Sequence, residues 1–147
     1  MSGHENENLG RVLALDIGTV RTGAAISDPM RMIAQGLDVW PHSDFKKNFE
    51  QCVKKYSPKL ILVGMPFRTD GSAGPEAKRI EALVDDLKAD YPDLQFETWD
   101  ERYTTVIAQR AMIAADVSRK KRREQVDKVA AAVILQNWLE YNRMSGE

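Results

Sequence analysis

The segment from Leu60 to Val63 constrains the fold most, because four apolar residues follow one another without a polar interruption. An unbroken apolar run of this kind is typical of a strand that is buried on both faces of a sheet. Helices are predicted on either side of it, one capped by Ser43 and ended by Pro58, the other running from Pro75 to Tyr91. The sequence therefore predicts an α/β fold with a sheet flanked by helices.

Four further strands and two further helices complete the pattern. The first two strands form a hairpin whose exit turn is Asp28-Pro29, and the third strand is weaker. The expected strands are residues 11–17, 22–27, 35–40 and 94–99, and the expected helices run from Thr104 or Thr105 to about 115 and, after a basic loop, from 125 to 141. Hairpin strands followed by alternating helices and strands indicate a mixed five-stranded sheet.

Length and composition exclude several classes of protein. A chain of 147 residues forms one domain, expected over residues 11–142, with tails at 1–10 and 143–147. The apolar stretches fall far short of the roughly 20 residues that span a membrane, and the acidic first tail lacks the apolar run of a secretory signal. The single cysteine, Cys52, cannot form an internal disulfide or a thiolate zinc site. We therefore expect a cytoplasmic protein that does not contact membranes.

Three carboxylates stand at chain reversals and are the candidate catalytic residues. Asp16 ends the first strand, Glu101 follows the last strand, and Asp127 is expected in the first turn of the final helix. If the first and last strands are near neighbours, their carboxyl ends share one edge of the sheet. Carboxylates without His or Cys suit Mg²⁺ or Mn²⁺, and two such ions can activate a water and stabilise the leaving oxygen of a phosphodiester. Each acid alone also fits a turn, a solvated rim or a helix dipole.

Basic residues beside these acids are candidate nucleic-acid contacts. The net charge is −1, but residues 102–128 carry a net +5 and residues 76–101 a net −6. Five of the bases form one run, expected in the loop before the final helix: Arg119, Lys120, Lys121, Arg122 and Arg123. Such a loop can bind a phosphate backbone without reading its sequence, or it can simply be solvated.

Four single bases have similar alternatives. Arg21 and Arg102 each lie beside a candidate acid, so they either bind the phosphate next to the scissile bond or pair with acids structurally. Arg68 lies in a glycine-containing loop, where it can touch phosphate. Lys128 follows Asp127 directly, where it can compete with a metal or point outward to phosphate.

Four motifs, in order over roughly residues 11–141, resemble those of the YqgF/RuvX family. They are Leu15-Asp16-Ile17-Gly18-Thr19 with Arg21 and Gly23, Val63-Gly64-Met65-Pro66 with Asp70-Gly71-Ser72, Asp100-Glu101-Arg102-Tyr103-Thr104-Thr105, and Val126-Asp127 leading into Ala130-Ala131-Ala132-Val133-Ile134-Leu135. Asp16, Glu101 and Asp127 fall on the three acidic positions of the family. Tyr103-Thr104 replaces a common Leu-Ser, and Lys128 replaces a small residue.

The resemblance implies a ribonuclease H-like fold, with the first three strands antiparallel and the others parallel. It also implies a metal-dependent nuclease, with two Mg²⁺ or Mn²⁺ ions, that matures the 5′ end of pre-16S ribosomal RNA, with ribosomal particles among its possible partners. The rival substrate within this class is a four-way DNA junction, which a resolvase cuts as a symmetric dimer. The sequence leaves the oligomeric state open.

Two readings from other classes remain. The segment Asp16-Ile17-Gly18-Thr19 also resembles the first phosphate loop of actin-like and sugar-kinase-like phosphotransferases. Those folds need two such lobes, and this chain has one motif and the length of one lobe. The other reading is a noncatalytic nucleic-acid or ribosome-assembly module. The three intact acids argue against it, and Lys128 argues weakly for it.

Overall fold

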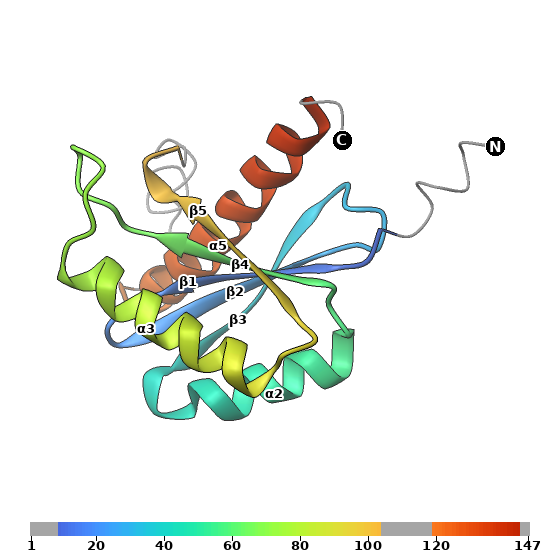
Figure 1. The fold of residues 1–147 in the computed structure, drawn as a ribbon, viewed down its shortest axis with the longest axis horizontal. Coiled ribbons are helices and arrows are strands. Elements are labelled where there is room, and N and C mark those ends of the chain that lie inside the picture. Colours follow the sequence, from blue (N-terminus) through green and yellow to red (C-terminus); the bar gives the residue numbers. More distant parts are fainter. Residues whose placement is uncertain (1–8, 104–118, 145–147) are drawn as a thin grey trace.

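The computed structural model of the chain describes the backbone of residues 9–103 and 119–144, and the side chains of residues 9–103 and 128–143. Its sheet has the order β3-β2-β1-β4-β5 (Figure 1). The strands β1, β2 and β3 are antiparallel neighbours, whereas β1, β4 and β5 run parallel. The strands are β1 Val12–Ile17, β2 Arg21–Ser27, β3 Ala34–Pro41, β4 Leu60–Met65 and β5 Gln95–Asp100. The predicted mixed sheet and its strand directions are confirmed.

Helices cover both faces of this sheet (Figure 1). The α-helices are α2 Phe45–Tyr56, α3 Pro75–Asp90 and α5 Arg119–Met144, and short 3-10 helices span η1 His42–Asp44 and η2 Glu101–Tyr103. The strand β4 is buried at all of its residues, as its apolar run predicts. Alternate residues of a strand face opposite sides, so Ile61 and Val63 pack under α2 and α3, while Leu60 and Leu62 pack under α5.

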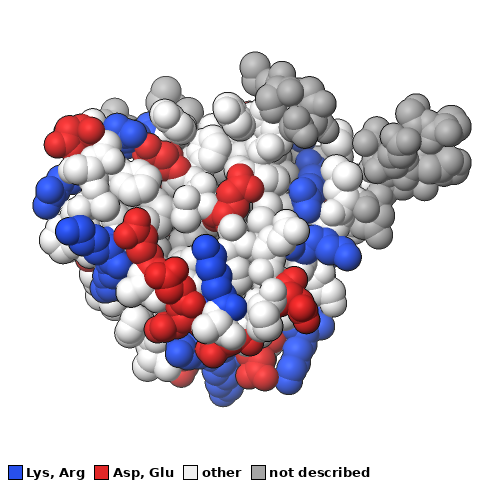
Figure 2. Space-filling view, in the orientation of Figure 1, with Lys and Arg blue, Asp and Glu red and all other residues white. Residues whose placement is uncertain are grey.

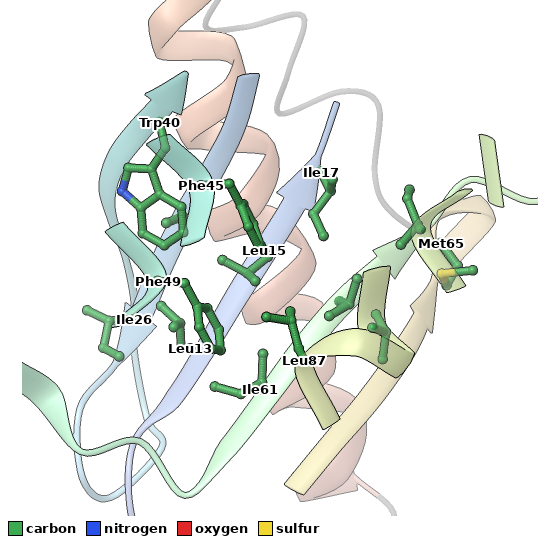
Figure 3. Close-up of a cluster of buried hydrophobic side chains, with 14 of the residues drawn as sticks. Leu13, Leu15, Ile17, Ile26, Trp40, Phe45, Phe49, Ile61, Met65 and Leu87 are labelled. Atoms are coloured by element: carbon green, nitrogen blue, oxygen red, sulfur yellow. The ribbon is translucent and has the colours of Figure 1, made fainter. Parts of the chain in front are cut away.

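The larger core cluster lies between the sheet and the helices α2 and α3. Figure 3 shows side chains of β1, β3, β4 and both helices meeting there. The ring of Phe45 stacks on Phe49 with centroids 6.0 Å apart and meets Trp40 edge-on at 5.9 Å. Rings at these distances attract one another beyond their burial, so this layer holds the sheet rigid behind the candidate site.

The helix α5 crosses the other face of the sheet. The Lys128 side chain lies over Gly36 of β3, Ile134 lies over Gly64 of β4, and the Trp138 indole Nε1 donates to Glu97 of β5 at 2.8 Å. The same face of β1 carries Asp16, because Val12 and Ala14, which are four and two residues earlier, pack under α5. The final helix is therefore the layer that covers the candidate carboxylates.

Several local predictions are wrong. The residue that precedes α2 is Asp44, which ends the 3-10 helix η1 and makes no side-chain cap bond, so Ser43 is not the cap. The run from Arg119 to Arg123 is not a loop, because α5 begins at Arg119; Asp127 accordingly lies in the third turn of that helix rather than its first. Lys and Arg are good helix formers, but this run has no apolar periodicity, so the sequence pattern did not indicate that the helix begins there.

Two further observations bear on the predictions. The helix expected after Thr104 lies outside the described residues. Within the described part of the chain, no helix is both long and apolar enough to cross a membrane.

Candidate active site

Asp16 and Glu101 meet at the carboxyl edge of the parallel strands. The strands β1 and β5 both run parallel to β4, one on each side of it, so their carboxyl ends lie at one edge. Asp16 is the penultimate residue of β1, and Glu101 follows the last residue of β5. The two carboxyl groups share a hydrogen bond. The first and last strands are therefore near neighbours with one strand between them, as the carboxylate hypothesis requires.

Gly64 of β4 leaves the space in which Glu101 lies. A Cβ added at Gly64 would stand 2.7 Å from the Oε2 atom of Glu101 and 2.8 Å from the Cδ1 atom of Ile134. Both distances are shorter than any normal contact, so a side chain at this position would displace the carboxylate. The sequence analysis placed Gly64 in a motif but gave it no role. The available signal was a glycine within an apolar strand, which often marks a close approach of neighbouring groups.

The environment of Glu101 favours its neutral form. Burial raises the pKa of Glu101, and the charge of Asp16, the hydrogen bond with Asp16 and the charge of Asp100 raise it further, to about 8. Two close carboxylates cannot both be ionised at low cost, so at neutral pH Glu101 keeps a proton and donates it to Asp16. A carboxylate pair that shares a proton is suited to a divalent cation, which can replace that proton and bind both groups through oxygen.

The third candidate acid belongs to the helix that covers this edge. Asp127 precedes Ala131 by four residues and Ile134 by seven, so the helical period puts position 127 on the stripe of α5 that packs against the sheet. Its side chain lies outside the described part of the structure. Among the residues that are described, no group of three or more His, Cys, Asp or Glu is close enough to hold a metal ion.

Arg102 pairs with an acid, and that acid is Asp100 rather than Glu101. Its Nε and Nη2 atoms donate to the Asp100 carboxylate at 2.6–3.0 Å, and its Nη1 donates to the carbonyl oxygen of Thr69 at 3.2 Å. These bonds raise the pKa of Arg102 and lower that of Asp100. Of the two roles considered for Arg102, the structure shows the pairing with an acid.

The other single bases lie around the same edge or on the layer above it. Arg21 begins β2 beside the end of β1 and lines a groove of about 290 Å³ together with Val20 and Pro41. The Arg68 guanidinium lies against Gly74 at the start of α3, with its Nε atom 3.0 Å from the position of an added Cβ. The aliphatic stem of Lys128 packs over Gly36 of β3, which is the edge strand opposite β5. The side chains of the run from 119 to 123 are outside the described residues.

Charge alone does not mark a nucleic-acid site on the visible face. Figure 2 shows Lys and Arg interspersed with Asp and Glu over the face seen in Figure 1. The case for this edge of the sheet therefore rests on the paired carboxylates.

A family model and named relatives match most of this chain. The family model described as "RuvX: Holliday junction resolvase" matches residues 10–141. A protein of Halothermothrix orenii named "Putative pre-16S rRNA nuclease" is 44% identical over 141 residues, covering 92% of this chain and 99% of its own. A protein of Desulforamulus reducens with the same name is 42% identical over 133 residues, covering 88% and 96%.

Solved structures extend the likeness to the fold. Thermus thermophilus RuvC in complex with a Holliday junction matches with a TM-score of 0.56 at 15% identity, covering 92% of this chain and 96% of that one. The yeast mitochondrial Holliday junction resolvase Ydc2 matches with a TM-score of 0.56 at 14% identity, covering 90% and 78%. The predicted ribonuclease H-like fold is thus confirmed, and the chain belongs to the RuvX family of nucleases.

Proposed function

We propose that this protein is a metal-dependent phosphodiesterase that trims the 5′ end of pre-16S ribosomal RNA in the cytoplasm, through a single domain over residues 11–142. The observation that carries the proposal is the pair formed by Asp16 and Glu101 at the carboxyl edge of the sheet. Two partly buried acids that share a proton stabilise the fold poorly, so the pair points to a role in binding cations. The names of the relatives favour ribosomal RNA as the substrate.

The residues that would hold two Mg²⁺ or Mn²⁺ ions are Asp16, Glu101 and Asp127. When bound, such ions supply an activated water and stabilise the leaving oxygen of the phosphodiester. Asp16 stands in β1 between β2 and β4 and would be a ligand of these ions. Glu101 and Asp127 would each hold one ion and orient the water.

Bases around the edge would hold the nucleic-acid backbone. Arg21 begins β2, and Arg68 lies in the loop between β4 and α3. The helical run from Arg119 to Arg123 precedes Asp127 by one to two turns, so a strand bound to it would pass toward the carboxylates. Lys128 can reach phosphate beside β3. These contacts neutralise phosphates and give a salt-sensitive, sequence-independent affinity.

The proposal is tested by incubating the purified protein with Mg²⁺ or Mn²⁺ and two labelled substrates. One is an RNA that carries the 5′ extension of 16S rRNA, and the other is a four-way DNA junction. Asp16→Asn removes one ligand of the proposed site, and Asp85→Asn is the matched control, because Asp85 is exposed on α3. Metal-dependent cutting of the RNA by the wild type and Asp85→Asn, but not by Asp16→Asn, is the expected result.

Other outcomes distinguish the alternatives. Paired symmetric nicks in the junction alone would replace the proposal with a Holliday junction resolvase, the activity that names the matching family model and the yeast structure. If neither substrate is cut and Mn²⁺ does not bind, the protein is a noncatalytic nucleic-acid or ribosome-assembly module. Addition of a ribosomal particle to the RNA reaction shows whether such a partner is needed.

A further inference from the structure

We propose that Arg102 is a positioning residue that fastens the loop of residues 66–74 to the end of β5, so that this loop and Glu101 form one rigid wall of the substrate groove. The inference rests on the proposed nuclease function for its effect on turnover. The fastening itself is a property of the folded chain and can be measured without any substrate.

The guanidinium of Arg102 is held on two sides. Toward β5, Nε lies 3.0 and 2.9 Å from the two carboxylate oxygens of Asp100, Nη2 lies 2.6 Å from Oδ2, and the backbone N–H of Arg102 donates to Oδ1 at 3.0 Å. Toward the loop, Nη1 donates to the carbonyl oxygen of Thr69 at 3.2 Å. A bidentate pair of this kind fixes the orientation of the planar group, so Arg102 connects two segments that are 33 residues apart.

The loop that Arg102 contacts is closed by its own hydrogen bonds. The Asp70 carboxylate accepts from the backbone N–H and the hydroxyl of Ser72 at 2.9 and 2.7 Å. The N–H of Arg68 donates to the Ser72 carbonyl at 2.9 Å, and the N–H of Gly71 donates to the Arg68 carbonyl at 2.8 Å. Gly71 has a φ of +90° and lies under the Arg102 guanidinium. Because the loop is already a compact unit, a single attachment point is enough to set its position.

This attachment joins the loop to the candidate carboxylates. Glu101 and Arg102 are neighbours in η2, and Gly64, which makes room for Glu101, is two residues before the start of the loop. Movement of Arg102 would therefore move Glu101 through the shared turn and Arg68 through the loop. The attachment sets the distance between a metal-binding carboxylate and a phosphate-binding cation, and misplacement by about 1 Å can cost roughly 100-fold in rate.

A direct phosphate contact by Arg102 is the competing role, and the ion pair with Asp100 weakens it. The Asp100 carboxylate already neutralises the guanidinium and occupies its Nε and Nη2 donors. A phosphate would have to compete with that carboxylate for the charge of Arg102, and the described bonds leave it one N–H on each of Nη1 and Nη2. Arg102 is thus expected to act on the substrate through the loop and through Glu101, without touching it.

The two roles predict opposite effects of Asp100→Asn. If Arg102 positions the loop, Asp100→Asn and Arg102→Lys each lower kcat by about tenfold, the double variant is no more than about twofold worse than either, and the salt dependence of KM is unchanged. If Arg102 binds phosphate, Asp100→Asn frees the cation and lowers KM, while Arg102→Ala reduces the salt slope by about 1. The second pattern would overturn the proposal.

Hydrogen exchange tests the attachment independently of turnover. The amides of Arg68, Gly71 and Ser72 should exchange about tenfold faster in Arg102→Lys and in Asp100→Asn, with the melting temperature of each variant close to that of the wild type. Arg79→Lys is the matched control, because Arg79 forms an exposed pair with Glu76 on α3 at 2.9 Å. Unchanged exchange in both variants would overturn the proposal, even if the protein cleaves neither substrate. A failed cleavage assay with faster exchange would instead count against the proposed function alone.

Discussion

Replacing Asp16 by asparagine should stabilise the metal-free protein while it abolishes cleavage. The expectation follows from the Asp16–Glu101 pair, in which burial and the neighbouring charge hold the pKa of Glu101 at about 8. The pKa of Glu101 in the folded state exceeds its ordinary value of 4.5. Protonated Glu101 therefore contributes its full stabilisation of the fold below pH 4.5. That stability is lost progressively as the pH rises toward 8.

The size of the effect can be worked from the same pair. With about 1.4 kcal/mol for each pH unit, ionised Glu101 costs the folded state roughly 4–5 kcal/mol relative to the unfolded chain. Burial is the largest cause, and Asp16 supplies the next two, its charge and its hydrogen bond. If Asp16 accounts for about a third of the cost, Asp16→Asn gains roughly 1–2 kcal/mol at pH 9. It should change little at pH 4.5, where Glu101 in the folded state is protonated and carries no charge for Asp16 to repel.

Urea unfolding with EDTA, followed by tryptophan fluorescence, measures this difference between pH 4.5 and 9. The free energy of unfolding of Asp16→Asn minus that of the wild type should grow with pH, with equal m values. Asp85→Asn, on the exposed surface of α3, should show no such growth. A difference that stays flat, or that favours the wild type at pH 9, would refute the idea that the two acids repel one another in the fold.

Three further outcomes are expected. Gly64→Ala should lower Mn²⁺ affinity at least about tenfold and destabilise the fold by about 1–3 kcal/mol, because its Cβ would stand 2.7 Å from Glu101 Oε2; calorimetry and urea unfolding check both. Mn²⁺ binding to the wild type should strengthen by about tenfold per pH unit between pH 6 and 8 and release close to one proton, because the ion displaces the proton shared by Asp16 and Glu101. Titrations in buffers of different ionisation enthalpy count that proton, and a pH-independent affinity would contradict the shared-proton site. Ser27→Ala should cost about 1–3 kcal/mol, since its buried hydroxyl accepts from the Val12 N–H at 2.8 Å; an unchanged urea midpoint would show that water replaces the hydroxyl.

Local patterns were sufficient to predict the sheet. The apolar run in β4 and the apolar periodicity of the two helices beside it can each be recognised within a few neighbouring residues. The same holds for Asp16 and Glu101, because strand ends are marked by the change from apolar to turn-forming residues. Once β1, β4 and β5 are parallel, their carboxyl ends must share an edge.

The start of α5 was not visible from these patterns. Helix starts are recognised from apolar periodicity and capping residues, and the run from Arg119 to Arg123 has neither. The prediction therefore placed Asp127 one to two turns too early in the helix. Tertiary packing of the later apolar stripe, from Ala130 onward, stabilises the whole helix.

The sequence by itself predicted the candidate residues and the edge of the sheet at which Asp16 and Glu101 lie, because residue types and chain reversals are local properties. Only the tertiary structure decided how those residues act on one another. Arg102 pairs with Asp100 and not with the adjacent Glu101. The missing side chain at Gly64 leaves the space in which Glu101 lies. The raised pKa of Glu101 arises from burial under α5 and from Asp16, a residue 85 positions away in the chain. Distance, desolvation and shared hydrogen bonds depend on strands brought together by folding, and no spacing along the sequence specifies them.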